Sequence, residues 1–140
     1  MKSTGSAVWQ GGIKDGKGAI STKSGVLKDQ AYGFGTRFEG KPGTNPEELI
    51  AAAHAACFSM ALSKALGDAG FTAEKLDSSA EVSLEQKDGG FAITSSKLTL
   101  KATVPGIDDA KFQEIAAAAK AGCPVSKVLN AEISLSATLG

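Results

Sequence analysis

The sequence predicts a single domain over residues 1–140 that combines β-strands with helices. Several segments alternate apolar and polar residues, as half-buried strands do. A long apolar helix starts after Asn45 and Pro46, and a second helical pattern follows Asp108. A chain of 140 residues is long enough for one hydrophobic core and short for two.

The charge balance argues against a nucleic-acid or membrane partner. Fifteen basic and fifteen acidic residues cancel, and the lysines form no run. The N-terminus lacks the apolar core of a secretion signal, and the near-apolar run 49–62 is too short for a membrane span and carries His54 and Ser59. We therefore expect a soluble cytoplasmic protein, in which two cysteines are either inert or redox-active.

The first third of the chain predicts three strands. Residues 7–13 and 17–22 flank an Asp15-Gly16 step that favours a hairpin turn. The segment 34–39 alternates, with Phe34 and Phe38 on one face, which predicts a short third strand.

A helix is predicted to begin at Pro46. Asn45 has the form of an N-cap and Glu48 that of a capping-box acid. The helix should run to about Leu66, with Gly67 or Gly70 near its end.

This helix lacks a solvated face. Between Leu49 and Leu66 the only charged residue is Lys64, so it should be covered on more than one side. A second subunit is the natural cover and predicts a symmetric homodimer. The alternative is a helix enclosed by the core of its own chain.

The C-terminal half predicts a second hairpin, two helices and a last strand. Residues 80–85 alternate, a turn lies at 87–90, and the returning strand keeps its apolar face only through a bulge near Ser95-Ser96. Helices are expected from Asp108 to Ala121 and from Pro124, followed by an alternating strand over 131–139.

Cys57 and Arg37 are the first candidates for chemistry. Cys57 lies too deep in its helix for the helix dipole to activate the thiol. Arg37 is the only arginine, and a guanidinium can hold a thiolate and a carboxylate together. The alternative for Arg37 is an ordinary surface residue on a strand.

Glu47 is the better acid partner for such a site. At 100° per residue Glu47 projects nearer to Cys57 than Glu48 does, yet ten residues of helix span about 15 Å. A direct contact between Glu47 and Cys57 along one unbroken helix is therefore excluded. The alternative role for Glu47 is a favourable acid in the first helical turn.

Cys123 and His54 complete the candidates. Cys123 precedes Pro124, so it should be the N-cap of a short helix, where a thiolate is favoured and leaves readily from a disulfide. The alternative is a buried small hydrophobe. His54 and Cys57 could form a metal pair or a nucleophile and base, but a packed or interface histidine is the simpler interpretation.

Several motifs closely resemble the osmotically inducible protein C (OsmC) family. They cover Thr36–Gly40, Gly43–Ile50, Ala52–Leu62 and Ala121–Ser126, together with 104–108, and the two cysteine motifs at this separation are highly specific. The related organic hydroperoxide resistance proteins take their arginine from an earlier strand. Residues 7–23 hold no arginine, so the OsmC branch fits better.

The resemblance implies an α+β fold with antiparallel sheets and a long central apolar helix, in an intertwined homodimer. It implies a thiol-dependent peroxidase that reduces organic hydroperoxides in oxidative or osmotic stress defence, with no cofactor and no metal. Cys57 then matches the peroxidatic cysteine and Cys123 the resolving cysteine. Arg37 matches the activating arginine and Glu47 its acid partner. An external dithiol, for which a lipoylated protein is the family's favoured source, would reduce the Cys57–Cys123 disulfide.

Two other classes of function remain open at this point. A non-catalytic dimer that binds an apolar ligand would keep two unreactive thiols. A Cys-His thiol hydrolase would depend on His54.

Overall fold

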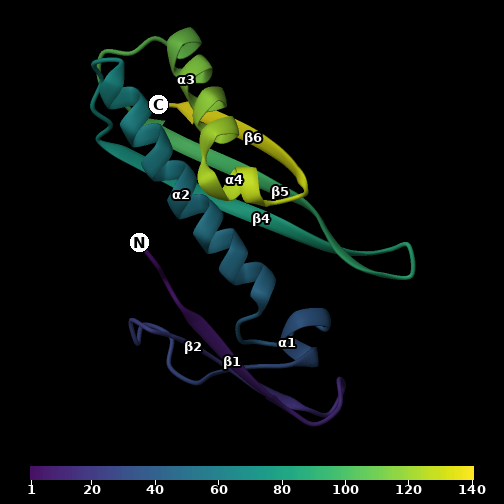
Figure 1. The fold of residues 1–140 in the computed structure, drawn as a ribbon. Helices are drawn as coiled ribbons and strands as arrows, with labels where there is room; N and C mark the ends of the chain where they lie inside the picture. Colours follow the sequence, from purple (N-terminus) through teal and green to yellow (C-terminus); the bar gives the residue numbers. More distant parts are fainter. The chain divides into compact units, whose positions relative to one another are not determined.

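The computed structural model describes residues 1–140, which divide into two compact units, 1–49 and 50–140. Figure 1 labels the elements of both units except β3, and each unit is described by itself. The prediction of a single domain over 1–140 stays a prediction.

The first unit is built on a three-stranded antiparallel sheet, in the order β1-β2-β3. Its strands are β1 (Gly5–Gln10), β2 (Lys17–Thr22) and β3 (Gln30–Tyr32). The predicted hairpin is confirmed, since Gln10 pairs with Lys17, but its loop takes in residues 11–16 rather than a two-residue Asp-Gly turn. The positive φ of this loop falls on Gly11, at 94°.

The predicted strand over 34–39 is wrong, because these residues form the short helix α1 (Phe34–Phe38). The Thr36 hydroxyl accepts from the Gly33 N–H at 3.0 Å, and the Arg37 N–H donates to the Gly33 carbonyl at 3.1 Å. Phe34 and Phe38 still share a face, with ring centroids 4.9 Å apart. A spacing of four residues suits both a strand and a helix, so the alternation did not distinguish the two.

The long helix α2 (Pro46–Asp68) begins and ends where the sequence indicates. The Asn45 side chain accepts from the Glu48 N–H at 2.8 Å, which confirms the N-cap. At the other end Gly70 has φ +90°, and the Phe71 N–H donates to the Leu66 carbonyl at 2.9 Å. This is the left-handed closing turn that favours glycine.

The second unit has a three-stranded sheet in the order β4-β5-β6. β4 (Lys75–Lys87) and β5 (Gly90–Thr103) form the predicted hairpin, whose turn places Asp88 and Gly89 at φ 52° and 81°. Ser83 pairs with Ser95 and Leu84 with Ile93, so Thr94 is an extra residue on β5. This confirms the predicted bulge.

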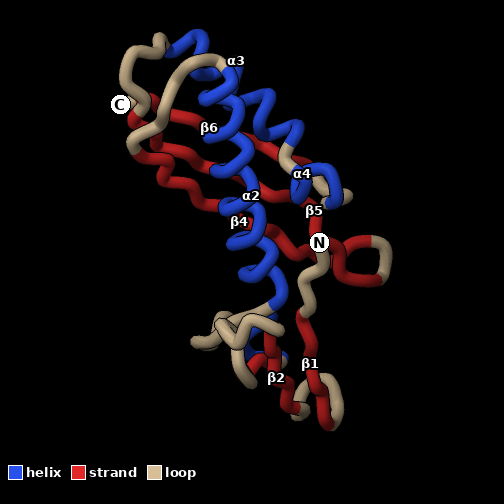
Figure 2. The backbone as a smooth tube through the Cα atoms, turned by 60° about the vertical axis from the view of Figure 1, so that its left-hand side comes forward, coloured by secondary structure: helices blue, strands red, loops and turns tan.

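One strand pair of the second sheet departs from the predicted antiparallel arrangement. β6 (Glu132–Leu139) runs parallel to β5, because the chain crosses over through α3 (Asp109–Gly122) and α4 (Pro124–Val128) between them. Figure 2 shows these helices in blue beside the red strands. The α+β class itself is confirmed.

The core of the second unit lies between the helices and the sheet. On α2 the fully buried residues recur every four positions, namely His54, Phe58, Leu62 and Leu66. They meet Phe112 and Ala116 of α3 and the inward-facing residues of β5, namely Leu98, Leu100 and Ala102. Burial of one such Leu or Phe side chain stabilises the fold by about 1.5–3 kcal/mol.

α2 is long and apolar enough, by length and composition, to cross a membrane, a test that core helices of globular proteins also pass. Only 22% of its most apolar window is buried by the chain itself. Cover of the remaining surface by a second subunit stays a prediction.

His54 is a polar residue in this buried stripe. Its Nδ1 lies 2.6 Å from the Ser96 hydroxyl of β5, and its Nε2 lies 2.7 Å from the Ser126 hydroxyl of α4. Burial lowers the pKa of His54, so the imidazole is neutral at physiological pH. The packed histidine of the sequence analysis is confirmed.

This lowered pKa makes stability depend on pH. Below about pH 6.5 the unfolded chain binds a proton at His54 that the folded chain resists, so stability falls as pH falls. Between pH 7.5 and 5.5 His54 should account for a loss of up to about 1.4 kcal/mol in the free energy of unfolding. Urea unfolding at both pH values measures it. His54→Gln cannot titrate and should lose less over the same interval; an equal loss in both chains would contradict the assignment.

Candidate functional site

Four residues were singled out for chemistry, and the structure brings them together as two pairs, one in each unit. Arg37 and Glu47 lie in the first unit, and Cys57 and Cys123 in the second.

In the first pair Arg37 comes from α1 and Glu47 from the first turn of α2. Arg37 Nη2 donates to Glu47 Oε1 at 2.7 Å and Nε donates to the same oxygen at 3.1 Å. The Glu47 side chain is 9% exposed and that of Arg37 35%. Because Nε and Nη2 donate to Glu47, the N–H groups of Nη1 remain available to another acceptor.

Two further contacts hold this pair in place. The Asn45 side chain donates to the Thr36 carbonyl at 3.0 Å and so ties the start of α2 to α1. The guanidinium carbon of Arg37 lies 5.4 Å from the centroid of the Phe38 ring, within cation–π range. The short helix α1, found where a strand was predicted, therefore helps to orient the Arg37 side chain.

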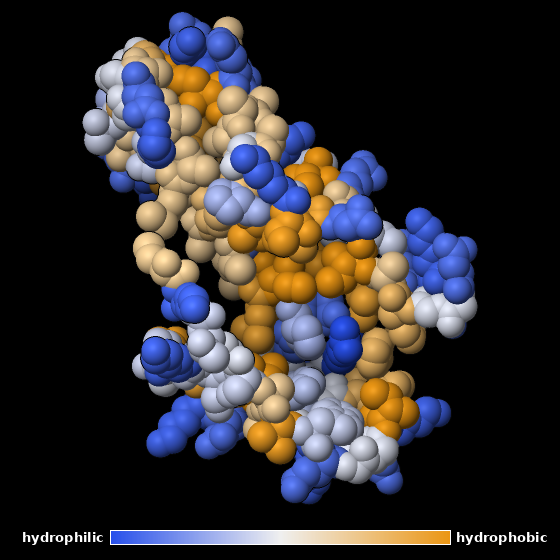
Figure 3. All heavy atoms as spheres, in the orientation of Figure 1, coloured by the Kyte–Doolittle hydropathy of each residue, from blue (hydrophilic) through white to orange (hydrophobic).

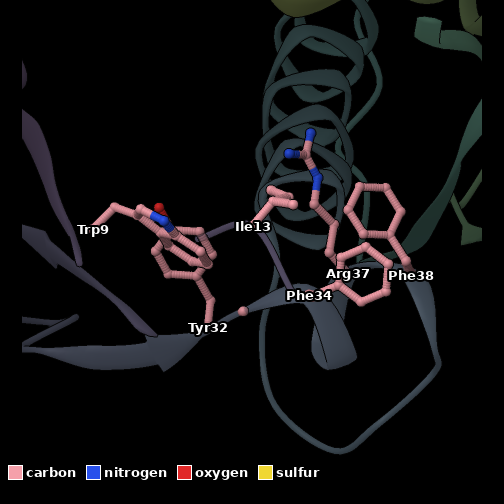
Figure 4. A pocket seen from close by; sticks show the side chains of 7 residues that line it. Trp9, Ile13, Tyr32, Phe34, Arg37 and Phe38 are labelled. Carbon is pink, nitrogen blue, oxygen red and sulfur yellow. The ribbon is translucent and has the colours of Figure 1, made fainter. Parts of the chain in front are cut away.

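A pocket of about 210 Å³ opens beside Arg37 in the first unit. Its walls are mostly apolar and comprise Trp9, Ile13, Tyr32, Gly33, Phe34 and Phe38. Figure 4 shows the Trp9 and Tyr32 rings on one side and the Phe34 and Phe38 rings next to the Arg37 side chain. The pocket combines one cation with aromatic walls, which suits a ligand with an apolar body and a polar end.

The Trp9 and Tyr32 wall depends on a glycine between them. The two ring centroids are 5.6 Å apart across β2. A Cβ on Gly18 would lie 2.3 Å from Tyr32 and 2.7 Å from Trp9, so any larger residue would displace both rings. The sequence analysis did not find this wall, because it depends on the register of β1, β2 and β3.

The second pair consists of two free thiols on different elements. Cys57 is partly buried on α2, and Cys123 is fully buried at the N-cap of α4. Each thiol shifts the pKa of the other. The predicted N-cap position of Cys123 and the predicted start of a helix at Pro124 are both confirmed.

The surroundings of the two thiols favour the thiolate on Cys123. Burial raises the pKa of Cys123, but the backbone N–H of Ser126, the Cys57 thiol, the Ser126 hydroxyl and the Val125 N–H together outweigh it and lower that pKa below the ordinary value. These polar groups act without a short capping bond to the Cys123 sulfur. The effect is the one expected of exposed N–H groups at a helix start.

Cys57 shows the opposite shift. Burial and its hydrogen bond to Cys123 raise the pKa of Cys57, and the Val125 N–H offsets only part of this. The surroundings of Cys57 in the second unit therefore disfavour its thiolate. A cation near Cys57 would be needed to make it the better nucleophile.

His54 does not serve Cys57. Both of its ring nitrogens are engaged by serine hydroxyls, so the nucleophile-and-base pair of a Cys-His hydrolase and the metal pair are wrong interpretations. Ser96 and Ser126 were missed by the sequence analysis. Ser96 could have been predicted from the sequence. It alternates with Leu98 and Leu100 and so lies on the buried face of β5, where a serine hydroxyl needs a hydrogen-bond partner.

Comparison with known proteins identifies the family of the chain. The family model described as OsmC-like protein matches residues 38–138. The chain is 63% identical over 131 residues to Peroxiredoxin OsmC of Escherichia coli (strain K12), which covers 94% of this chain and 92% of the relative. It is 32% identical over 119 residues to the organic hydroperoxide resistance protein OhrB of Bacillus subtilis (strain 168), covering 84% and 85%.

Solved structures show the same fold. The crystal structure of OhrB of Bacillus subtilis superposes with a TM-score of 0.72 at 32% identity, covering 96% of this chain and 98% of that one. An organic hydroperoxide resistance protein from Legionella pneumophila gives 0.69 at 30% identity, with 96% of each chain covered. By the family model and by these identities, the chain belongs to the OsmC-like protein family.

Proposed function

We propose that this protein is a thiol-dependent peroxidase that reduces organic hydroperoxides to alcohols. The observation that carries the proposal is the pair of free thiols, Cys57 and Cys123, which interact with one another and of which Cys123 has a lowered pKa. Relatives named for peroxiredoxin activity and for organic hydroperoxide resistance support the same chemistry.

Cys57 is the peroxidatic cysteine, which reacts with the hydroperoxide, and Cys123 is the resolving cysteine, which reacts with the oxidised Cys57. The Cys57 thiolate attacks the terminal oxygen of the hydroperoxide, the O–O bond breaks, and the alkoxide leaves and takes a proton as an alcohol. Cys57 is left as a sulfenic acid. The Cys123 thiolate then attacks the Cys57 sulfur, hydroxide leaves and is protonated to water, and a disulfide remains.

Arg37 supplies the cation that Cys57 lacks. Glu47 holds the guanidinium by two of its N–H groups, and the remaining edge can stabilise a thiolate and the charge that develops on the leaving oxygen. The aromatic pocket beside Arg37 provides an apolar site for the alkyl or aryl part of the substrate. An external dithiol, such as a lipoylated protein, returns the disulfide to two thiols.

The active protein is a homodimer in which residues 1–140 of each chain act as one domain. α2 carries exposed apolar side chains, including Met60 at 77% exposure, and every residue of β1 is exposed, including Val8 at 62%. Figure 3 shows hydrophobic surface around α2 and α4. A second copy is the natural cover for such surfaces. Two free cysteines also suit the reducing cytoplasm.

Turnover of cumene hydroperoxide with dithiothreitol as reductant tests the cysteine roles. Cys57→Ser should abolish hydroperoxide consumption, because no sulfenic acid can form. With dithiothreitol left out, Cys123→Ser should consume about one hydroperoxide per chain and then hold a sulfenic acid that dimedone labels. Full activity of Cys57→Ser would sink the proposal. Absence of a disulfide after a stoichiometric dose of hydroperoxide would favour the non-catalytic ligand binder instead.

The role of the Arg37–Glu47 pair is tested by steady-state kinetics. Arg37→Lys keeps the charge but loses the two-pronged geometry, and kcat/KM should fall by about 100-fold. Glu47→Gln should lower it by a smaller factor. Glu39→Gln is the matched control, because Glu39 forms an exposed pair with Lys41 at 3.1 Å, and its kcat/KM should not change. Wild-type kinetics in Arg37→Lys would rule out this role.

The dimer is tested by sedimentation velocity at micromolar concentration. The mass should be that of two 14.1 kDa chains. Met60→Lys places a charge on the exposed apolar face of α2 and should shift the equilibrium toward monomer. A wild-type chain that sediments as a monomer would contradict the homodimer while leaving the thiol chemistry open to its own test.

A further inference from the structure

One wall of the aromatic pocket is built on a single row of residues across the first sheet. Trp9 of β1 pairs with Gly18 of β2, and Gly18 pairs with Tyr32 of β3, so the three residues are direct cross-strand neighbours. Cross-strand neighbours face the same side of a sheet. The Trp9 and Tyr32 rings meet over the glycine, with centroids 5.6 Å apart and planes at 54°.

A glycine in the middle of a central strand needs a reason, because it has no side chain to pack and weakens the strand. At Gly18 an added Cβ would collide with the Tyr32 ring and lie 2.7 Å from a Trp9 ring carbon, closer than Cβ atoms come to other atoms in folded proteins. Gly16, just before β2, is in the same situation, since its Cβ would lie 2.7 Å from Trp9 Cζ2. Both glycines leave the space in which the Trp9 ring lies.

The polar atom of the Trp9 ring is already engaged. Its Nε1–H donates to the Gly11 carbonyl at 3.0 Å. An indole has no other hydrogen-bonding group, so the ring can meet a ligand only through its apolar surface. The same bond fixes the orientation of the ring at the pocket wall.

The facing side of the pocket carries a second pair of rings and one cation. Phe34 and Phe38 have centroids 4.9 Å apart, and the Arg37 guanidinium carbon lies 5.4 Å from the Phe38 ring. Figure 4 shows the two ring pairs on opposite sides of the view, with Arg37 beside the phenylalanines. Arg37 is the only charged residue among those that line the pocket.

The size of the pocket suits one substituted ring. Its volume is about 210 Å³. An apolar cavity of about 150 Å³ is large enough to bind benzene. The pocket therefore has room for a single aromatic ring with a short branched substituent between the two ring pairs.

We propose that Gly18 is a specificity-determining residue, which lets the Trp9 and Tyr32 rings form a wall that selects hydroperoxides with an aromatic organic group over linear ones of the same carbon content. The inference rests on the peroxidase activity proposed above. The polar hydroperoxide group lies toward Arg37, and the organic group lies between the ring pairs.

Two physical effects favour the aromatic substrate. Ring-to-ring contacts in tilted or offset geometry are attractive beyond the apolar area that they bury. A linear chain with the same number of carbon atoms buries a similar area but loses freedom about each rotatable bond when the pocket holds it. Both effects act on the organic group alone, so they change selectivity without changing the chemistry at sulfur.

Steady-state kinetics with a matched pair of substrates tests the selectivity. Cumene hydroperoxide and n-nonyl hydroperoxide have the same number of carbon atoms, and kcat/KM should favour cumene hydroperoxide by about three- to tenfold. Gly18→Ala should bring this ratio close to one, mainly by raising KM for cumene hydroperoxide, because the added methyl group separates the Trp9 and Tyr32 rings.

Gly5→Ala is the matched control in the same sheet. The atom nearest to a Cβ on Gly5 of β1 is the Ser21 carbonyl oxygen at 3.8 Å, an ordinary contact, so the substrate ratio should not change. Tyr32→Leu removes one ring without adding a collision and should also lower the ratio. Circular dichroism shows which variants are folded, so the test does not depend on Gly18→Ala alone.

A binding measurement separates this proposal from the peroxidase itself. The chain has one tryptophan, so its fluorescence reports on Trp9. The probes are 2-phenyl-2-propanol, the alcohol formed from cumene hydroperoxide, and 1-nonanol, neither of which oxidises a thiol. The aromatic alcohol should bind several-fold more tightly to the wild-type chain and to Gly5→Ala, and the difference should disappear in Gly18→Ala and Tyr32→Leu. Equal affinities in the wild type, or an unchanged preference in folded Gly18→Ala or Tyr32→Leu, would overturn the proposal even if hydroperoxide turnover is found.

Discussion

The second unit depends on how the chain satisfies one buried imidazole. His54, Phe58, Leu62 and Leu66 form a single stripe on α2, and three of these need only apolar neighbours. His54 needs two hydrogen-bond partners, since a buried polar group without one costs about 1–3 kcal/mol. Ser96 and Ser126 meet that need from different elements, and in doing so they fix α4 against α2. The position of Cys123 next to Cys57 follows from the same contacts.

The pKa values of the two thiols shift in opposite directions, and the N–H groups at the start of α4 contribute to the lowered pKa of Cys123. The N–H groups of Val125 and Ser126 are fixed by the geometry of α4, so they favour negative charge on Cys123 in the reduced protein. Cys57 has no comparable set of donors. A peroxidatic role for Cys57 thus requires a positive group from outside the pair, and a guanidinium with one unused edge is the group best suited to supply it.

Local signals predicted the elements whose ends are set by backbone chemistry. Asn45 with Pro46 and Cys123 with Pro124 mark helix starts, and Asp88 with Gly89 marks a turn of positive φ; each was found where expected. The segment 34–38 misled because its two phenylalanines are four residues apart, a spacing shared by both periods. The hydrogen bond from the Gly33 N–H to the Thr36 hydroxyl lies at the start of this helix, and the alternation of apolar residues does not encode it.

Those site residues that lie in the family's sequence motifs could be predicted from the sequence. Cys57, Cys123, Arg37 and Glu47 could be named from resemblance, whereas their pairing with Ser126, Phe38 and Asn45 depends on register and crossover. The parallel placement of β6 after α3 and α4 is one such feature, since no local pattern encodes it. Ser96 is the instructive exception, because a serine in the inward register of a strand requires a buried partner. With a single histidine on the buried stripe of α2, that partner could have been inferred before any coordinates.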